Sequence, residues 1–169
     1  MPRRFCVGWR WLLAIALGAA AQADPAYPLI GHEAPDFALR AIAGENVRLS
    51  EHRGDVVVLS FWGSRCTPCR AQLAALNRSF GTYHSAGMQI YGISVDDDQA
   101  RAIAYARGEH LTFALLLDPG KTVSRSYEVD NLPMTLLVDR SGVVRHVFRD
   151  FDARSEGLYL QQLRELLNE

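Results

Sequence analysis

The chain has 169 residues, of which 49% are hydrophobic and 22% charged, and its formal net charge is −1 at pH 7. This length and composition are typical of one globular domain with enough residues to bury a core. The slightly acidic balance offers no electrostatic footprint for nucleic acid, so no nucleic-acid partner is expected.

The first 23 residues have the pattern of a secretory signal peptide. Three arginines precede an apolar run from Trp11 to Ala21, and Ala21-Gln22-Ala23 fits a small-residue cleavage site. The run falls short of the ~20 residues that cross a bilayer, so we expect a cleaved leader and no stable membrane insertion. Cleavage after Ala23 removes three positive charges and no acid, which lowers the formal charge from −1 to −4. The mature protein is then expected in the oxidising periplasm.

After the leader, residues 24–28 are interpreted as a short exposed segment, and residues 29–169 as one domain. The domain begins with alternating apolar residues on both sides of the turn signal Gly44-Glu45-Asn46. Phe37 and Leu39 precede this turn, and Val47 and Leu49 follow it. This alternation predicts a β-hairpin.

The next segment leads into a pair of cysteines. A continuous apolar run over residues 55–61 predicts a buried strand of the parallel type, and Cys66-Thr67-Pro68-Cys69 follows it. Cys69, Leu73 and Leu76 recur at helical spacing, so Cys69 should face the core and Cys66 should lie at the helix N-terminus. Free N–H groups and the helix dipole favour an anion there. In Cys-x-x-Cys motifs at such positions, the thiol pKa falls from ~8.5 to roughly 3.5–7.5, so the pattern predicts a thiolate at Cys66.

Structural and metal-binding explanations of this pair are less convincing. A disulfide between these cysteines closes a ring of about four residues, for which the chain-entropy estimate is only roughly 2 kcal/mol. A zinc site needs a second pair of ligands, and the only other cysteine is Cys6, in the leader. The five histidines show no metal-ligand spacing: His32, His52, His84, His110 and His146. We therefore expect no metal and no cofactor, and the pair favours redox chemistry.

The second half of the chain continues the alternation of strands and helices. Residues 88–95 predict a buried strand, and Asp96-Asp97-Asp98 should cap the helix that follows, because calcium loops space their ligands and include a glycine. A strand at 113–117, a short helix at 121–127 and a strand–turn–strand at 136–148 come next, before a final amphipathic helix. The fold class is therefore α/β, a central mixed β-sheet flanked by helices on both faces. The cysteines should lie at the carboxyl edge of a central strand.

Several motifs together resemble one family. Trp62-Gly63-x-x-Cys66-x-Pro68-Cys69 resembles the motif of the thioredoxin superfamily, and Pro133-x-Thr135 is similar to its cis-proline loop. Gly31-x-x-Ala34-Pro35-x-Phe37 and Gly92-Ile93-Ser94-Val95-Asp96 are similar to exported TlpA/ResA-like thiol–disulfide oxidoreductases. The resemblance covers roughly residues 29–167. It implies a thioredoxin fold with an N-terminal β-hairpin and an inserted strand and helix.

The resemblance also implies roles for individual residues. Cys66 would attack a disulfide, and Cys69 would resolve the mixed disulfide by attacking Cys66. Pro133 would be cis beside the cysteines, and the backbone of Leu132 would pair with an extended substrate segment. The remaining residues of the implied docking surface are Trp62, Thr67 and Pro68.

Two positions depart from the family pattern. Many members carry a glutamate three residues after the second cysteine, and thioredoxins bury an aspartate six residues before the first. Here these positions are Gln72 and Ser60, so the proton acceptor for Cys69 is left open between water and a remote acid. The loop Asn131-Leu132-Pro133-Met134-Thr135 also differs from the Gly-x-Pro-Glu-Thr of the cytochrome-c-maturation branch, which weakens an apocytochrome as the substrate.

The resemblance implies a periplasmic protein-disulfide reductase, and cytochrome c maturation is one setting for such an enzyme. Thr67 and Pro68 between the cysteines favour a reductant, because strong oxidants of the superfamily carry a histidine there. The expected partners are protein disulfides or dithiols and a membrane electron-donor protein. A monomer is expected because no interface stripe is visible in the sequence.

Two alternatives remain. Ser60 and Gln72 leave room for a non-catalytic binding module that uses the fold to hold a partner. Ala34-Pro35-Asp36-Phe37 also occurs in peroxiredoxin-like peroxidases, whose Pro-x-x-x-Thr-x-x-Cys motif activates peroxide. Neither a proline nor a threonine lies between Glu51 and Cys66, which disfavours the peroxidase.

Overall fold

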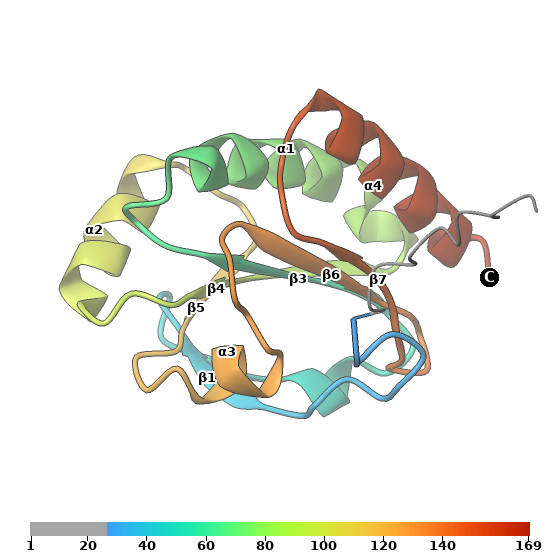
Figure 1. The fold of residues 1–169 in the computed structure, drawn as a ribbon, viewed down its shortest axis with the longest axis horizontal. Coiled ribbons are helices and arrows are strands. Elements are labelled where there is room, and N and C mark those ends of the chain that lie inside the picture. Colours follow the sequence, from blue (N-terminus) through green and yellow to red (C-terminus); the bar gives the residue numbers. More distant parts are fainter. Residues whose placement is uncertain (1–26) are drawn as a thin grey trace, which may run out of the picture.

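The structure is a computed structural model that describes residues 27–169. The predicted signal peptide, residues 1–23, and residues 24–26 lie outside the described part. Seven strands form one sheet in the order β2-β1-β5-β4-β3-β6-β7, and helices cover both of its faces (Figure 1). Within residues 27–169, no helix is both long enough and apolar enough to cross a bilayer.

The elements follow the predicted order. The strands are β1 (Ala38–Ala41), β2 (Asn46–Arg48), β3 (Val56–Trp62), β4 (Met88–Ser94), β5 (Ala114–Leu117), β6 (Met134–Val138) and β7 (Val144–Phe148). The helices are α1 (Thr67–Tyr83), α2 (Gln99–Gly108), α3 (Thr122–Ser126) and α4 (Ala153–Leu167), with short 3-10 turns at Leu49–His52 and His84–Ala86.

The sheet is mixed, as predicted. β3 pairs in parallel with β4, and β4 pairs in parallel with β5. The hairpins β1–β2 and β6–β7 are antiparallel, and so are the pairs β3–β6 and β1–β5. The fold class and the N-terminal hairpin predicted from the sequence are therefore confirmed.

β3 is buried along its whole length because both faces of the sheet are covered. Its alternate side chains enter two separate apolar clusters. One cluster packs against α1, α2 and α4, and the other packs against α3 and the N-terminal segment. All seven residues of β3 are buried, which explains the continuous apolar run in the sequence.

The prediction of an exposed segment through Pro28 was wrong at Tyr27. This side chain is only 6% exposed, and its hydroxyl donates a hydrogen bond to the backbone carbonyl of Tyr127. The guanidinium of Arg149 lies 5.4 Å from the centre of the Tyr27 ring. Burial of the hydroxyl, together with nearby Glu128, raises the pKa of Tyr27 to about 12. The segment before the hairpin is therefore part of the core on the α3 side of the sheet.

Candidate active site

The two cysteines lie where β3 passes into α1, as the spacing predicts. Cys66 is the N-cap residue of α1, and its Sγ accepts a hydrogen bond from the Cys69 backbone N–H at 3.2 Å. The two residues form a disulfide bond. Cys66 is partly exposed, whereas Cys69 is fully buried. A partner can therefore contact the sulfur of Cys66, whereas the sulfur of Cys69 is buried and can exchange only with Cys66.

The cis-proline loop lies beside this junction. The peptide bond between Leu132 and Pro133 is cis. Antiparallel pairing sets Phe61 opposite Met134, so Pro133 stands at the end of β3 from which the cysteine turn departs. Leu132 is partly exposed and packs against the apolar cluster that also contacts Cys66. The sheet register thus brings together two segments that are far apart in the sequence.

Asp96 braces the turn before the cysteines. Its carboxylate accepts hydrogen bonds from the Ser64 backbone N–H at 2.8 Å, from Ser64 Oγ at 2.9 Å and from Ser94 Oγ at 3.0 Å. The expectation that all three aspartates cap α2 was therefore wrong, because only Asp98 is its N-cap residue. The parallel register pairs Trp62 with Ser94, which places Asp96 next to the turn. That pairing of β3 with β4 is the signal that could have identified Asp96.

Trp62 does not belong to a docking surface, which corrects the prediction from the family motif. Its side chain is 0% exposed and its ring centre lies 5.3 Å from that of Tyr105. The reason is the alternation of β3, which directs Trp62 into the cluster covered by the helices. Gly92 on the neighbouring strand leaves room for the side chains packed here, since a Cβ there would lie 2.5 Å from Leu115 Cδ2 and 3.3 Å from Trp62 Nε1. The side chains exposed between the cysteines are those of Thr67 and Pro68.

A buried polar network occupies the two positions that depart from the family pattern. Ser60 Oγ donates a hydrogen bond to Gln72 Oε1 at 3.0 Å, and Gln72 Nε2 donates to Thr135 Oγ1 at 2.5 Å. All three residues are at most 2% exposed. Gln72 lies three residues after Cys69, on the buried side of α1. No side chain of this network is a carboxylate. The network therefore links α1 to β3 and β6 but offers Cys69 no carboxylate that could accept its proton.

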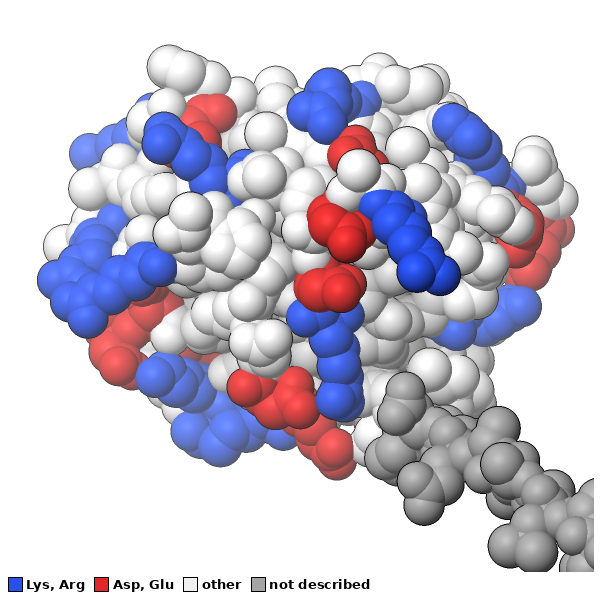
Figure 2. Space-filling view, turned by 45° about the horizontal axis from the view of Figure 1, so that its top comes forward, with Lys and Arg blue, Asp and Glu red and all other residues white. Residues whose placement is uncertain are grey.

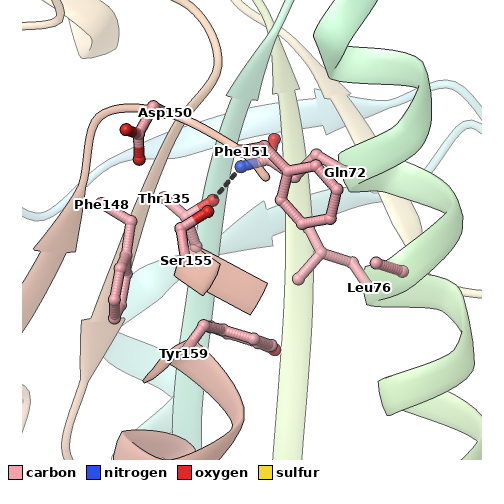
Figure 3. Close-up of a pocket in the computed structure, with 9 residues that line it drawn as sticks. Gln72, Leu76, Thr135, Phe148, Asp150, Phe151, Ser155 and Tyr159 are labelled. Atoms are coloured by element: carbon pink, nitrogen blue, oxygen red, sulfur yellow. Dashed lines mark hydrogen bonds between the residues drawn. The ribbon is translucent and has the colours of Figure 1, made fainter. Parts of the chain in front are cut away.

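The network borders a small cavity between α1, β6 and the start of α4 (Figure 3). Gln72 and Thr135 lie on one side of this cavity, joined by their hydrogen bond, and the connection from β7 to α4 contributes Asp150 and Phe151. Asp150 is the only carboxylate among the residues that line it. Cys69 is not one of the residues that line this cavity.

Replacing Gln72 with leucine is expected to lower the free energy of unfolding by about 1–3 kcal/mol, because Ser60 and Thr135 lose their shared partner while buried. Urea unfolding of the mature protein measures this loss. The matched control is Gln161→Leu on the exposed side of α4, for which a change within about 0.5 kcal/mol is expected. Equal effects of the two substitutions would show that the buried network contributes nothing to stability.

Within residues 27–169, no group of three or more His, Cys, Asp or Glu side chains is placed to hold a metal ion. Two of the histidines instead have polar contacts of their own. His52 Nε2 lies 2.7 Å from the Tyr91 hydroxyl, and His84 Nδ1 lies 3.1 Å from the carbonyl oxygen of Met88.

Comparisons with known proteins fit this geometry. Residues 30–147 match the model of a family described as the AhpC/TSA family. The thiol-disulfide oxidoreductase ResA of Geobacillus kaustophilus (strain HTA426) is 34% identical over 118 residues, which are 70% of this chain and 68% of the relative. ResA of Bacillus cereus (strain ZK / E33L) is 28% identical over 142 residues, 83% of this chain and 82% of the relative. A crystal structure of a candidate thiol:disulfide interchange protein DsbE from Chlorobium tepidum has 32% identity and a TM-score of 0.77, and the match covers 80% of this chain and 95% of that one.

Relatives with this activity match most of the chain, and the cysteine pair lies at the strand-to-helix junction beside the cis-proline loop. The protein is therefore a thiol–disulfide oxidoreductase with a thioredoxin fold. More specifically, because the family model matches well over half of its residues, the chain belongs to the AhpC/TSA family.

Proposed function

We propose that the protein reduces disulfides of exported proteins in the periplasm, with Cys66 as the attacking sulfur and Cys69 as the resolving sulfur. The observation that carries this proposal is the asymmetry of the pair. Cys66 is partly exposed at the N-terminus of a 17-residue helix, and Cys69 is fully buried three residues later. Free N–H groups and the dipole of α1 favour a thiolate at the exposed position.

Each cycle transfers two electrons from the cysteine pair to the partner. The Cys66 thiolate attacks one sulfur of the partner disulfide, the partner S–S bond breaks, and the second partner sulfur leaves as a thiolate that takes up a proton. Cys69 then loses its proton to water or to a remote carboxylate and attacks Cys66 Sγ. The mixed disulfide breaks, the first partner sulfur leaves and is protonated, and the Cys66–Cys69 disulfide forms.

The docking of the partner uses the exposed surroundings of Cys66. Thr67 and Pro68 lie between the cysteines at the surface, and Leu132 precedes the cis-proline. In the proposed complex, the backbone of Leu132 pairs with an extended segment of the partner, as an added strand does. Pro133 is buried and shapes the loop that presents Leu132.

The periplasmic setting is supported by the signal-peptide pattern of residues 1–23. An oxidising compartment requires a second protein that returns electrons to the cysteines, and we propose a membrane electron donor for this step. The reductase is expected to act as a monomer. Cytochrome c maturation is one proposed setting, although the loop at residues 131–135 departs from the pattern of that branch, so an apocytochrome is best tested as one substrate among others.

The reduction potential of the mature protein tests the direction of transfer. Equilibration of the Cys66–Cys69 pair with glutathione or dithiothreitol is expected to give a value near or below the roughly −270 mV of thioredoxin. A value near the roughly −120 mV of the strong periplasmic oxidant DsbA would make the protein a disulfide donor. Consumption of hydrogen peroxide at the rate of disulfide reduction would favour the peroxidase instead.

A further inference from the structure

Three adjoining depressions, together called the groove below, lie between Cys66 and Leu132 of the cis-proline loop. Their volumes are about 200, 300 and 410 Å³. Arg65 lines both the first and the second depression, and Val95 lines both the second and the third. The first depression contains Cys66, and the third ends at Leu132. A segment bound along this groove would pass the reactive sulfur and Leu132 in one extended path.

The end of the groove at Cys66 is cationic. The residues lining the first depression are Ser64, Arg65, Cys66, Thr67, Arg70 and Tyr105, which include two guanidinium groups and no carboxylate. Arg70 is already engaged, because its Nη2 lies 2.7 Å from Glu109 Oε1. By contrast, none of the ion pairs or side-chain hydrogen bonds within residues 27–169 involves Arg65, which is exposed. Arg65 is thus the cation next to Cys66 that has no internal partner in the described part of the chain.

Asp96, Asp97 and Asp98 line the second depression together with Arg65 and Arg101, and each of these aspartates already has a hydrogen-bond or ion-pair partner. Asp96 accepts three hydrogen bonds from Ser64 and Ser94. Asp97 lies 2.8 Å from Lys121 Nζ, and Asp98 caps α2. Elsewhere, on the face seen in Figure 2, basic and acidic side chains are interspersed, so no field of one sign covers that face. Of the two cations beside Cys66, Arg70 is paired with Glu109, so Arg65 is the one left to pair with a charged partner.

We propose that Arg65 selects partner segments that carry an aspartate or glutamate next to the reacting cysteine. This inference rests on the proposed function, because it requires a partner cysteine to reach Cys66 Sγ. A residue adjacent to that partner cysteine would lie within reach of position 65, which immediately precedes Cys66. The planar guanidinium pairs with a carboxylate through two parallel hydrogen bonds. An exposed pair of this kind is expected to raise the rate by about fivefold at most.

The proposed role of Arg65 is tested with two cyclic peptide disulfides. The peptides differ in one residue beside a cysteine, which is Glu in one and Lys in the other. The reduced mature protein is mixed with each peptide in a single turnover, and peptide reduction is followed by mass spectrometry after acid quenching. Each rate constant is divided by the rate constant for reduction of the same peptide by dithiothreitol. This ratio corrects for the intrinsic reactivity of the peptide disulfide. The wild type should prefer the Glu peptide by up to about fivefold, and Arg65→Glu should reverse this preference. The matched control is Arg40→Glu on β1, which is exposed and outside the groove.

The outcomes separate this inference from the function on which it rests. Equal preference in the wild type and in Arg65→Glu would overturn the role of Arg65 and leave the reductase intact. A change of the same size for both peptides would also overturn it, since the substitution would then act on the Cys66 thiolate rather than on recognition. Failure of the wild type to reduce either peptide would instead overturn the proposed function.

Discussion

Replacing Cys66 with serine is expected to abolish disulfide reduction, with a loss of more than roughly 1000-fold in turnover. A serine hydroxyl is not ionised at neutral pH and cannot form a disulfide, so neither the first attack nor the mixed disulfide is possible. The measurement is reduction of a protein disulfide by the mature protein with an excess of dithiol reductant, corrected for the reaction of the reductant alone.

The matched variant is Cys69→Ser, which keeps the proposed attacking sulfur and removes the proposed resolving one. It should accumulate a mixed disulfide between Cys66 and the partner, visible on a non-reducing gel and by mass. If Cys66→Ser still held its partner as tightly as the wild type, and the wild type showed no turnover, the protein would be a binding module. If Cys69→Ser released products at the wild-type rate, Cys69 would not be the resolving residue.

Replacing Trp62 with alanine is expected to lower the free energy of unfolding by about 3–5 kcal/mol. The reason is its position: the side chain is 0% exposed in the cluster under α1 and α2, so truncation leaves a cavity. Urea unfolding followed by far-UV circular dichroism measures the loss and does not depend on the fluorescence of Trp62.

Trp62→Phe is the matched variant and should cost much less, because it retains an aromatic ring and removes an Nε1–H group that has no hydrogen-bond partner within residues 27–169. Leu158→Ala, at a side chain that is 50% exposed, provides the baseline for a substitution at the surface. If Trp62→Ala kept the stability of the wild type but bound substrate more weakly, Trp62 would have the docking role that the family motif implied.

Much of the fold could be predicted because the relevant signals are local. The continuous apolar run of β3 follows from burial on both faces, and the helical spacing of Cys69, Leu73 and Leu76 follows from their contact with the sheet. The same alternation within β3 could also have corrected one prediction. Ser60 and Trp62 share a face of that strand, so the orientation that leads Ser60 to Gln72 on α1 also buries Trp62.

Other features depend on contacts between distant residues, and no local pattern contains them. Tyr27 is buried because it contacts the backbone of Tyr127, one hundred positions along the chain. Asp96 braces Ser64 because β3 and β4 pair in one particular register. A sequence shows which residues are able to make such bonds, but the sheet register decides which of them meet.

Because only one sulfur is accessible, the electron donor and the substrate have to react with the protein one after the other. Because Cys69 is fully buried and Cys66 is partly exposed, the electron donor and the substrate of the proposed reductase must both approach the same atom. The donor and the substrate cannot both contact Cys66 Sγ at once, so the protein reacts with them alternately, as in a ping-pong mechanism. The donor reacts with the oxidised pair and the substrate with the reduced pair, so each competes with the other only where it also binds the redox state that the other needs. Steady flow requires the supply of electrons and the demand for them to be matched in the cell.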